Sequence, residues 1–533
     1  MQSSAGVTDC LARAIQKEYE NGQTDYSMHP LVVVDKANQP AGVIADGDSV
    51  IFCCKRGERE TQLTDSFVDP QFGYFERKRL RDLYFATFTL YHNKYSSWNI
   101  PVAFKPEMTE GTLGEVIAKE GLRQLRIAES EKFAHVTFFF NGETNSAFCG
   151  EERISIDSPK NVPFDSVPAL SLPQVSSRLI QEIESEKYHF VVTNFANGDI
   201  IGHTSNFDAK VACAREVDRR LQEVTQHALS KGYTVCVTAD HGVLETGFKD
   251  NGNPNVSHTK ALVPFIIVDP HVKGSTLKNG RLSNIAATIL DMMGIAKPDN
   301  YNESLFVSKP AFRNNRILLI ILDGWGIGKQ DGRNPIYTAH TAFFDSLMRD
   351  YPVATLLASE ENVGLLPGKA GNSEAGHMNI GAGRVVPQDD VIIQQSIESG
   401  SFFQNQVLVR AIDRLKEAGG NLHLIGLLSH KSSHGTMDYM LNVLDIARAR
   451  GTERAFLHVI LDGRSTDPGS APDLVRELGA SLDHIGIGQI ASIVGRGIAL
   501  DRDHNYIGKT KLAYDAMVYG TGTFIRCVQS KTE

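Results

Sequence analysis

The residues best suited to chemistry are an aspartate and a serine in two short motifs. The apolar run ILLIIL at 317–322 ends at Asp323 and Gly324, and the segment GNSEAGHMNIGAGR holds Ser373. An apolar run that ends in an acid is typical of a buried parallel strand, and open α/β sheets keep their chemistry at the carboxyl edge of such strands. A serine in a glycine-rich turn can be presented to a ligand. Either motif alone is more often a turn or a helix cap.

More aspartates and histidines follow other apolar runs. The run FVVTNFA precedes Asp199 and His203. The run TVCVTAD ends in Asp240, which His241 follows directly, and His258 lies shortly before the next run. Each histidine alone is more often a cap or core residue, but carboxylates and imidazoles without cysteine are together the donors that divalent cations prefer. Two such ions could hold a phosphoryl group and activate a serine hydroxyl.

A second group of polar residues is mostly basic and also follows predicted strands. It consists of Arg56, Arg59, His434, Arg464, Arg496 and Arg502. Arginines that converge on one cleft bind phosphate and carboxylate groups bidentately. Helix capping or salt bridges would explain one of these arginines easily and all of them poorly.

Composition places the chain among globular proteins. Its 533 residues are too many for one core and predict two domains. Lys and Arg number 54 against 63 Asp and Glu, a formal charge of −9, which argues against a nucleic-acid partner. The cysteines number seven and lack paired metal spacing, which favours a reduced cytosolic protein. No targeting segment or membrane span is evident, so we expect a cytoplasmic protein without a membrane partner.

The elements that must position these residues alternate in type. Helical and strand patterns alternate over 176–300 and again after 388, which predicts an α/β fold with two doubly wound domains and parallel sheets. The region 80–105 also has strand character, and 106–111 is a predicted linker. The run HVTFFFN, just after Lys132, is predicted to be a strand.

These motifs resemble those of the cofactor-independent (2,3-bisphosphoglycerate-independent) phosphoglycerate mutases of the alkaline phosphatase superfamily. The matching blocks include ILDGWG, GNSEAGHMNIGAGR, LHLIGLLS, LDGR, ALDRD, NFANGDIIGHT and TADHG, and they span nearly the whole chain. Residues 316–533 resemble the family's first part and 1–300 its second, so the sequence is similar to a circular permutant, natural or engineered. Met1 and Glu533 should then lie close together on one domain.

The resemblance implies an interrupted domain order. An alkaline-phosphatase-like, metal-binding domain at 113–388 would carry the nucleophile. It would be inserted between the two parts of a transferase-like domain, 1–105 and 396–533. Two hinge strands would join the domains, and their closure would exclude water.

The resemblance also assigns roles. Ser373 would be the nucleophile that becomes phosphoserine, and Lys132 would neutralise the phosphoryl group. One divalent ion, most commonly manganese, would be bound by Asp199, His203 and His258. The other would be bound by Asp323, Ser373, Asp240 and His241. The phosphoglycerate would be bound by His434, Arg464, Arg496, Arg502, Arg56 and Arg59.

The implied reaction interconverts 3-phosphoglycerate and 2-phosphoglycerate in glycolysis and gluconeogenesis without bisphosphoglycerate. The expected partner is this small-molecule substrate, and we expect a monomer. Two alternatives stay open: a metal-dependent phosphatase or other phosphomutase of the same superfamily, and a catalytically silent binding protein with this fold.

Departures from the family fall on the glycerate side. The family has Asp directly after the arginine of LDGR, and here that residue is Ser465. Asp467 lies two residues further on, a shift that usually spoils proton-transfer geometry. The turn before His434 reads HKSS in place of an Asp-Gly-Gly type turn, and Cys54 replaces the usual Asn before Arg56. The sequence therefore supports transfer of the phosphoryl group to Ser373 better than its transfer back to the glycerate.

Overall fold

The computed structural model describes residues 5–105, 109–272, 274–308, 310 and 315–527, which form two compact units. Unit 1 comprises Met1–Pro106 and Ile392–Glu533, and unit 2 comprises Glu107–Val391. Unit 2 is thus one continuous segment, whereas unit 1 is assembled from both ends of the chain. The prediction for Met1 and Glu533 falls outside the described residues. Among the described residues, no helix is long and apolar enough to span a membrane.

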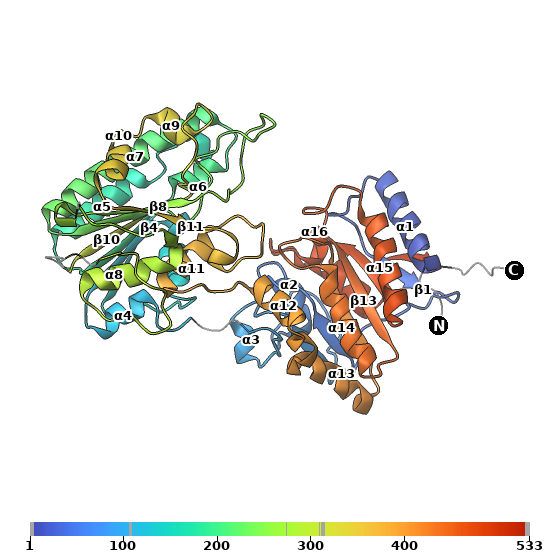
Figure 1. The fold of residues 1–533 in the computed structure, drawn as a ribbon. Helices are drawn as coiled ribbons and strands as arrows, with labels where there is room; N and C mark the ends of the chain where they lie inside the picture. The colour runs from blue at the N-terminus through green and yellow to red at the C-terminus, as the bar shows by residue number, and fades with distance from the viewer. Residues whose placement is uncertain (1–4, 106–108, 273, 309, 311–314, 528–533) are drawn as a thin grey trace. The chain divides into compact units, whose positions relative to one another are not determined.

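The described part of unit 1 contains a seven-stranded sheet in the order β15-β1-β14-β13-β12-β2-β3 (Figure 1). Its strands are β1 (Leu31–Val34), β2 (Ser49–Phe52), β3 (Tyr84–Thr87), β12 (Leu422–Leu428), β13 (Ala455–Leu461), β14 (Gln489–Gly495) and β15 (Thr523–Arg526). The five strands from β3 to β14 are parallel, and β1 runs antiparallel to β14. The carboxyl ends of β2, β12, β13 and β14 therefore share one edge.

Helices cover both faces of this sheet. They are α1 (Ala5–Glu20), α2 (Thr61–Val68), α3 (Lys94–Ser97), α13 (Gln406–Ala418), α14 (Met437–Ala449), α15 (Ala471–Ile485), α16 (Arg496–Ala499) and α17 (Lys511–Val518). Another helix, α12 (Asp389–Glu398), spans the boundary between the units. Along β12, Leu424 packs in one apolar cluster while Ile425 and Leu427 pack in another. This period of two is what a sheet buried on both faces requires.

The described part of unit 2 contains an eight-stranded sheet in the order β5-β4-β6-β10-β7-β8-β11-β9. Its strands are β4 (Gln124–Glu129), β5 (Glu151–Ile156), β6 (Phe190–Phe195), β7 (Thr234–Thr238), β8 (Val263–Val268), β9 (Gly280–Arg281), β10 (Ile317–Leu322) and β11 (Val353–Leu357). Strand β10 lies between β6 and β7, and all its residues are buried. The apolar run before Asp323 is therefore the centre of the sheet.

Helices also flank both faces of the unit 2 sheet. They are α4 (Leu113–Lys119), α5 (Leu172–Glu184), α6 (Asn197–Gly202), α7 (Phe207–Ser230), α8 (Ile285–Met293), α9 (Pro335–Ala339), α10 (Ala342–Asp350) and α11 (Ser373–Ala382). Figure 1 shows α5, α7 and α10 on one face and α4, α8 and α11 on the other. The predicted α/β class is confirmed.

Three local predictions were wrong. The run HVTFFFN forms a π-helical turn, η2 (His135–Phe139), because β4 already ends at Glu129 and the chain turns at once through the short helix η1 (Ser130–Lys132). Strand β8 is antiparallel to β7, because residues 239–262 between them contain no crossover helix. In 80–105 only β3 forms as a strand.

Four buried polar side chains form a chain of hydrogen bonds across the sheet of unit 1. Asp48 Oδ2 lies 3.1 Å from His423 Nε2, and His423 Nδ1 lies 3.0 Å from His458 Nε2. His458 Nδ1 lies 2.8 Å from Ser492 Oγ. Burial, with a smaller effect of His423, lowers the pKa of His458 well below its usual value, so His458 is neutral in the folded protein. The carboxylate of Asp48 thus anchors one end of this series of hydrogen bonds.

Substituting Asp48→Asn should destabilise unit 1 by about 2 kcal/mol, because the amide nitrogen cannot accept the hydrogen bonds that the carboxylate accepts. Asp48 accepts from the backbone N–H groups of Ala45 and Asn421, each at 2.7 Å. Urea unfolding, followed by Trp98 fluorescence in a Trp325→Phe background, would report on unit 1 alone.

The matched control for this prediction is Asp9→Asn. Asp9 makes an exposed ion pair with Arg476 at 3.1 Å, and such pairs contribute at most about 1 kcal/mol. Equal midpoints for the two variants would contradict the anchoring role of Asp48.

Candidate metal centre and nucleophile

The carboxyl edge of the unit 2 sheet gathers most of the candidate residues. Asp323 follows β10 directly, Asp199 lies in α6 just after β6, and Asp240 follows β7. Because β6, β10 and β7 are adjacent and parallel, these three aspartates meet at one edge. His258 joins them from the segment before β8, since an antiparallel strand begins where its neighbour ends.

Two glycines allow the surrounding backbone to approach closely. Gly324 has a φ of +72°, and a Cβ there would lie 2.7 Å from the backbone nitrogen of Asp199. A Cβ at Gly376 of α11 would lie 2.7 Å from the Asp240 Cβ. Because these two glycines lack a side chain, the strand ends and α11 can lie close together.

Ser373 is the first residue of α11, and its hydroxyl lies at the centre of the cluster. Its Oγ is 2.7 Å from Lys132 Nζ, 3.0 Å from His241 Nε2 and 3.1 Å from Asp323 Oδ1. Ser373 is 6% exposed, so its hydroxyl is largely shielded from water. Lys132, and His241 when it is protonated, can donate to Oγ while the serine hydroxyl donates to the Asp323 carboxylate, an arrangement that suits a nucleophile awaiting an anionic group.

A first set of metal donors consists of Asp199, His203 and His258. His258 Nε2 lies 3.0 Å from both Asp199 Oδ1 and His203 Nε2, and His203 Nε2 lies 3.2 Å from Asp199 Oδ1. The Nδ1 atoms of His203 and His258 lie 2.9 and 2.8 Å from the carbonyls of Val256 and Gly371. If each Nδ1 carries a proton, both Nε2 lone pairs face the carboxylate, an arrangement that fits a cation.

A second set lies on the other side of Ser373. His241 Nε2 is 3.4 Å from Asp323 Oδ1 and 3.6 Å from Asp240 Oδ2. Asp240 Oδ2 is buried and has no hydrogen-bond partner among the described residues. A buried carboxylate oxygen without a donor is costly, and a divalent ion would satisfy it. Oxygen and imidazole donors without thiolates also fit the hard to borderline ions expected from the sequence.

The structure adds one histidine that the sequence analysis missed. His377 is fully buried, and its donor atoms lie within 4.8 Å of those of Asp240 and Asp323. Asp199, His241 and His258 form another such group, so His241 lies between both sets. The signal in the sequence was the spacing from Ser373: four residues is one helical turn and gives a shared face.

The charges of the site are strongly coupled. Lys132 Nζ lies 2.6 Å from Asp199 Oδ2 and 3.0 Å from Asp323 Oδ1. Burial opposes the charge of Lys132, but the carboxylates of Asp323, Asp199 and Asp240 outweigh it and raise the lysine pKa. Burial likewise opposes the charge of His241, and the same aspartates raise its pKa to about 9. Lys132 and His241 are therefore both cationic at neutral pH in the metal-free protein.

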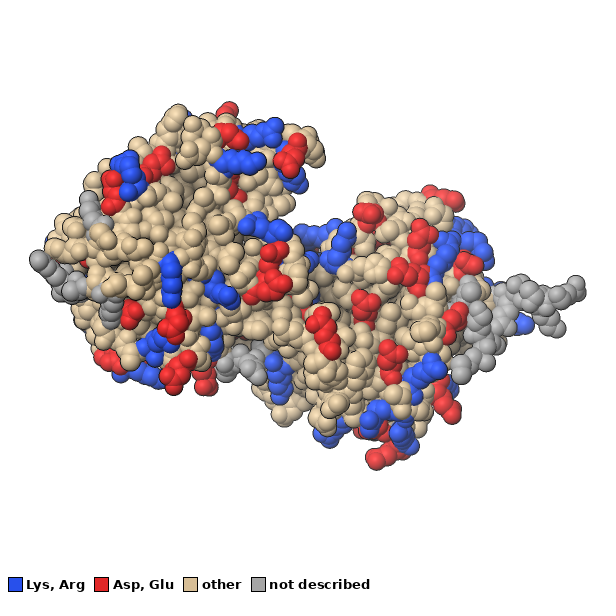
Figure 2. All heavy atoms as spheres, viewed as in Figure 1, with Lys and Arg blue, Asp and Glu red and all other residues tan. Residues whose placement is uncertain are grey.

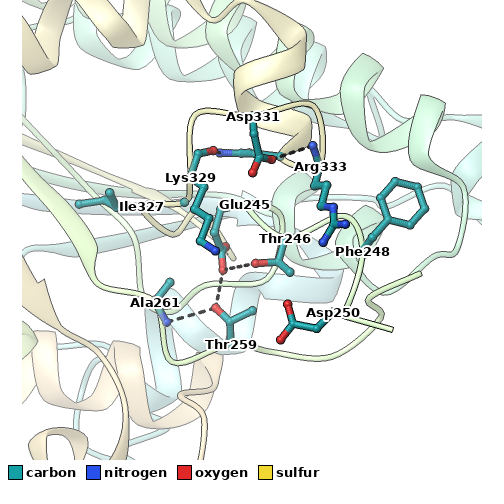
Figure 3. A pocket seen from close by; sticks show the side chains of 12 residues that line it. Glu245, Thr246, Phe248, Asp250, Thr259, Ala261, Ile327, Lys329, Asp331 and Arg333 are labelled. Carbon is teal, nitrogen blue, oxygen red and sulfur yellow. Dashed lines mark hydrogen bonds between the residues drawn. The ribbon is translucent and has the colours of Figure 1, made fainter. Parts of the chain in front are cut away.

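A pocket of about 560 Å³ lies beside this cluster in unit 2 (Figure 3). Its lining includes Glu245, which accepts hydrogen bonds from Thr259 Oγ1 and, at 3.2 Å, from the Gly326 backbone. Thr259 follows His258, and Gly326 belongs to the loop after Asp323. Glu245 thus ties together the two loops that carry these candidate ligands.

The predicted substrate-binding residues lie in unit 1, at or near the carboxyl ends of β2, β12, β13 and β14. They are Arg56, Arg59, His434, Arg464, Arg496 and Arg502. Arg59, His434 and Arg496 are buried. Arg464 is exposed, whereas Arg56 and Arg502 are half-exposed.

Internal acids hold several of these basic groups. His434 Nδ1 lies 2.7 Å from Glu60 Oε1, and Arg496 pairs with the buried Asp462. Arg56 and Arg502 both pair with Glu58, which draws them together. These acids offset part of the positive charge that the arginines bring to this sheet edge.

The position that departs from the family lies in the same region. The Ser465 backbone N–H donates to Asp462 Oδ2 at 2.8 Å, and Asp467 is exposed. Asp462 is itself occupied by Arg496, so it does not replace the family's carboxylate as a free base.

Binding of Mn²⁺ to the metal-free protein at pH 8 should release about one proton from His241, whose pKa of about 9 keeps it protonated until a cation displaces the proton. Metal affinity should consequently fall as the pH falls from 8 to 6. Calorimetric titration in buffers of different ionisation enthalpy would measure the proton count.

The control for proton release is His271→Asn, which removes an exposed histidine and should leave the count unchanged. His241→Asn should lower it. If the binding enthalpy of the unmodified protein is the same in every buffer, no proton is released, and this result would contradict the protonated state of His241.

Comparison with known proteins connects both units to described families. A family model described as the Metalloenzyme superfamily matches residues 12–297, and one described as the BPG-independent PGAM N-terminus matches residues 393–532. Asp199, Asp240 and His258 lie within the first match, whereas Asp323 and Ser373 lie outside both.

Several relatives carry the name 2,3-bisphosphoglycerate-independent phosphoglycerate mutase. The protein from Moorella thermoacetica is 41% identical over 54% of this chain and 55% of its own length, and that from Salinibacter ruber is 38% identical over 55% and 56%. A solved Leishmania mexicana phosphoglycerate mutase is 28% identical, with a TM-score of 0.40, over 51% of this chain and 53% of its own. The chain spans about half the length of the curated relatives it matches. Because the Metalloenzyme match covers more than half of the chain, the chain belongs to the Metalloenzyme superfamily.

Proposed function

We propose that this protein is an isomerase, a metal-dependent phosphoglycerate mutase that interconverts 3-phosphoglycerate and 2-phosphoglycerate through a phosphoserine at Ser373. The observation that carries the proposal is the position of Ser373 Oγ, 2.7 Å from Lys132 Nζ and 3.0 Å from His241 Nε2. A buried serine placed among cationic groups and metal donors is suited to accept a phosphoryl group. The names of the relatives support the choice of substrate.

The site residues would divide the work between metal binding and charge neutralisation. Asp199, His203 and His258 would hold one divalent ion. Asp240, His241, Asp323 and Ser373 would hold the other. Manganese is the expected metal in both positions, where it would supply positive charge and lower the pKa of the serine hydroxyl. Lys132 would balance the phosphoryl charge that remains.

The reaction would proceed by two transfers. Ser373 Oγ would lose its proton and attack the phosphorus of 3-phosphoglycerate, the bond from phosphorus to the C3 oxygen would break, and that oxygen would take up a proton. The C2 hydroxyl of the retained glycerate would then lose its proton and attack the same phosphorus, the bond from phosphorus to Ser373 Oγ would break, and Oγ would take up a proton. No net hydrolysis occurs if water stays excluded. The basic residues of unit 1 would bind the anionic groups of the substrate.

We further propose that the chain is a circular permutant of the mutase family. The model described as an N-terminus matches residues 393–532, after the Metalloenzyme match at 12–297. Unit 1 is also assembled from both ends of the chain. We retain the sequence-based domain assignment, with a phosphatase-like domain at 113–388 inserted in a transferase-like domain.

The remaining proposals follow from composition and surface. Figure 2 shows basic and acidic side chains interspersed on the visible face, which supports a small-molecule substrate over a nucleic acid. All seven cysteines are free thiols, which supports a cytoplasmic location. We propose a monomer without a membrane partner.

A second candidate function is a phosphatase of the same superfamily. It is favoured by one observation: Ser465 occupies the position of the family's glycerate-contacting Asp, and the nearby Asp462 is engaged by Arg496. Without a base to activate the glycerate hydroxyl, water could complete the cycle and release phosphate.

The function can be tested by incubating the protein with manganese and 3-phosphoglycerate, without bisphosphoglycerate, and following the mixture by phosphorus NMR. We expect a 2-phosphoglycerate signal that EDTA abolishes and that Ser373→Ala lowers at least about 1,000-fold, because the nucleophile is lost.

Other products would point elsewhere. Inorganic phosphate alone would favour the phosphatase. An unchanged spectrum, with and without EDTA, would favour a catalytically silent protein.

Substituting Ser465→Asp should raise the ratio of 2-phosphoglycerate to inorganic phosphate several-fold, because it restores a carboxylate that can accept the glycerate proton. Ser465→Asn is the matched control, since it has a similar shape but no basic carboxylate. The ratio can be measured by the same NMR assay. Equal ratios for both variants would show that Ser465 does not limit the return step.

A further inference from the structure

A ring of hydrogen bonds begins and ends at Ser373. The Ser373 hydroxyl donates to Asp323 Oδ1 at 3.1 Å, and Asn194 Nδ2 donates to Asp323 Oδ2 at 2.7 Å. Asn194 Nδ2 also lies 3.1 Å from His377 Nε2. His377 Nδ1 lies 2.9 Å from the Ser373 carbonyl oxygen, which closes the ring. The ring thus joins the hydroxyl of the candidate nucleophile to the backbone of the same residue.

The partners in the ring fix the tautomer of His377. An ionised Asp323 can only accept, so the Asn194 atom that faces it must be the amide nitrogen. The second N–H of that nitrogen points to His377 Nε2, which must therefore be the acceptor. The imidazole proton then lies on Nδ1, where it donates to the Ser373 carbonyl. Every bond in the ring has a defined direction.

Burial and topology make the ring rigid. Asp323 and His377 are fully buried, Asn194 is 1% exposed and Ser373 is 6% exposed, so water cannot readily replace a lost partner. Asn194 lies on β6, paired in register with Ile321 of β10, two residues before Asp323. The ring therefore connects two central strands to the first turn of α11.

We propose that Asn194 and His377 are positioning residues for phosphoryl transfer to Ser373, an inference that rests on the function proposed above. Asn194 holds Asp323 Oδ2, so that Oδ1 remains directed at Ser373 Oγ and at Lys132 Nζ, 3.0 Å away. His377 holds Asn194 on one side and the Ser373 backbone on the other. Neither residue would touch the phosphoryl group: Asn194 would act through the candidate metal ligand Asp323, and His377 through Asn194 and the Ser373 backbone.

The rival role for His377 is that of a metal ligand. Its Nδ1 lies 3.3 Å from Asp240 Oδ2, close enough for both to share an ion. In the ring, however, Nδ1 carries a proton and the Nε2 lone pair accepts from Asn194. Neither nitrogen is free to bind a metal unless the ring opens. The two roles therefore predict different metal contents after substitution.

The test compares His377→Gln and Asn194→Ser with the unmodified protein. The glutamine keeps an acceptor for Asn194 but loses the bond to Ser373, and the serine releases Asp323 Oδ2. Asn379→Ser is the matched control, because Asn379 is a buried asparagine of α11 whose amide donates to the backbone of Val363 and Ala375.

Two readouts are needed. Calorimetric titration with Mn²⁺ gives the number of bound ions and their affinity. Rapid-quench transfer of phosphate from labelled 3-phosphoglycerate to Ser373 gives the rate of phosphoserine formation, with steady-state KM measured beside it. We expect unchanged ion stoichiometry, KM within about threefold, and a phosphoserine rate reduced roughly 10- to 100-fold in both variants but not in Asn379→Ser.

Two outcomes would overturn the inference. Loss of one bound ion in His377→Gln alone would make His377 a ligand. If either folded variant forms phosphoserine at the full rate, the ring has no role in the reaction.

The inference can also be separated from the proposed function. If the unmodified protein forms no phosphoserine, the proposed function fails, and the visible spectrum of bound Co²⁺ then tests the ring. The inference predicts that Asn194→Ser shifts that spectrum, through the released Asp323, while Asn379→Ser leaves it unchanged. Identical spectra in all three proteins would contradict it. Thermal unfolding identifies any misfolded variant, and His377→Asn, which can keep the donor to Ser373, replaces His377→Gln in that case.

Discussion

The constraint that governs the candidate site of unit 2 is the presence of three buried carboxylates at one sheet edge. Asp199, Asp240 and Asp323 follow three adjacent parallel strands and would repel one another without cations between them. Lys132 and a protonated His241 supply that charge in the metal-free protein. The same negative field that raises the pKa of these two groups would attract divalent ions. Charge, rather than apolar packing, therefore dictates what the site can bind.

The position of Ser373, the candidate nucleophile, follows from this constraint. Ser373 can lie among the carboxylates only if α11 approaches the ends of the strands, and Gly376 allows that approach beside Asp240. The ring through Asn194 and His377 then fixes the hydroxyl relative to Asp323. The corresponding edge of unit 1 carries different groups, because its strand ends are followed by arginines that pair with Glu58 and Asp462.

Sequence analysis located the residues that directly follow strands. It missed residues whose roles depend on contacts between distant segments of the fold. Asp323 could be placed at a sheet edge because an apolar run and its terminal acid define both strand and edge. Asn194 gave no such signal, since its role comes from the register of β6 with β10, and the signal for His377 was only its spacing of one helical turn from Ser373. The run HVTFFFN was misassigned because strand propensity is weaker than the turn imposed after β4. The roles of the site residues remain predictions.

The central claim is that Ser373 carries the phosphoryl group between the two transfers. Acid quenching of the manganese-loaded protein with 3-phosphoglycerate, followed by mass spectrometry of the peptide containing Ser373, tests it most directly. The account predicts a phosphate, an added mass of about 80 Da, on Ser373 that appears within one turnover and is absent from Ser373→Ala. Product formation without any modified Ser373, or a phosphate carried on another residue, would contradict it.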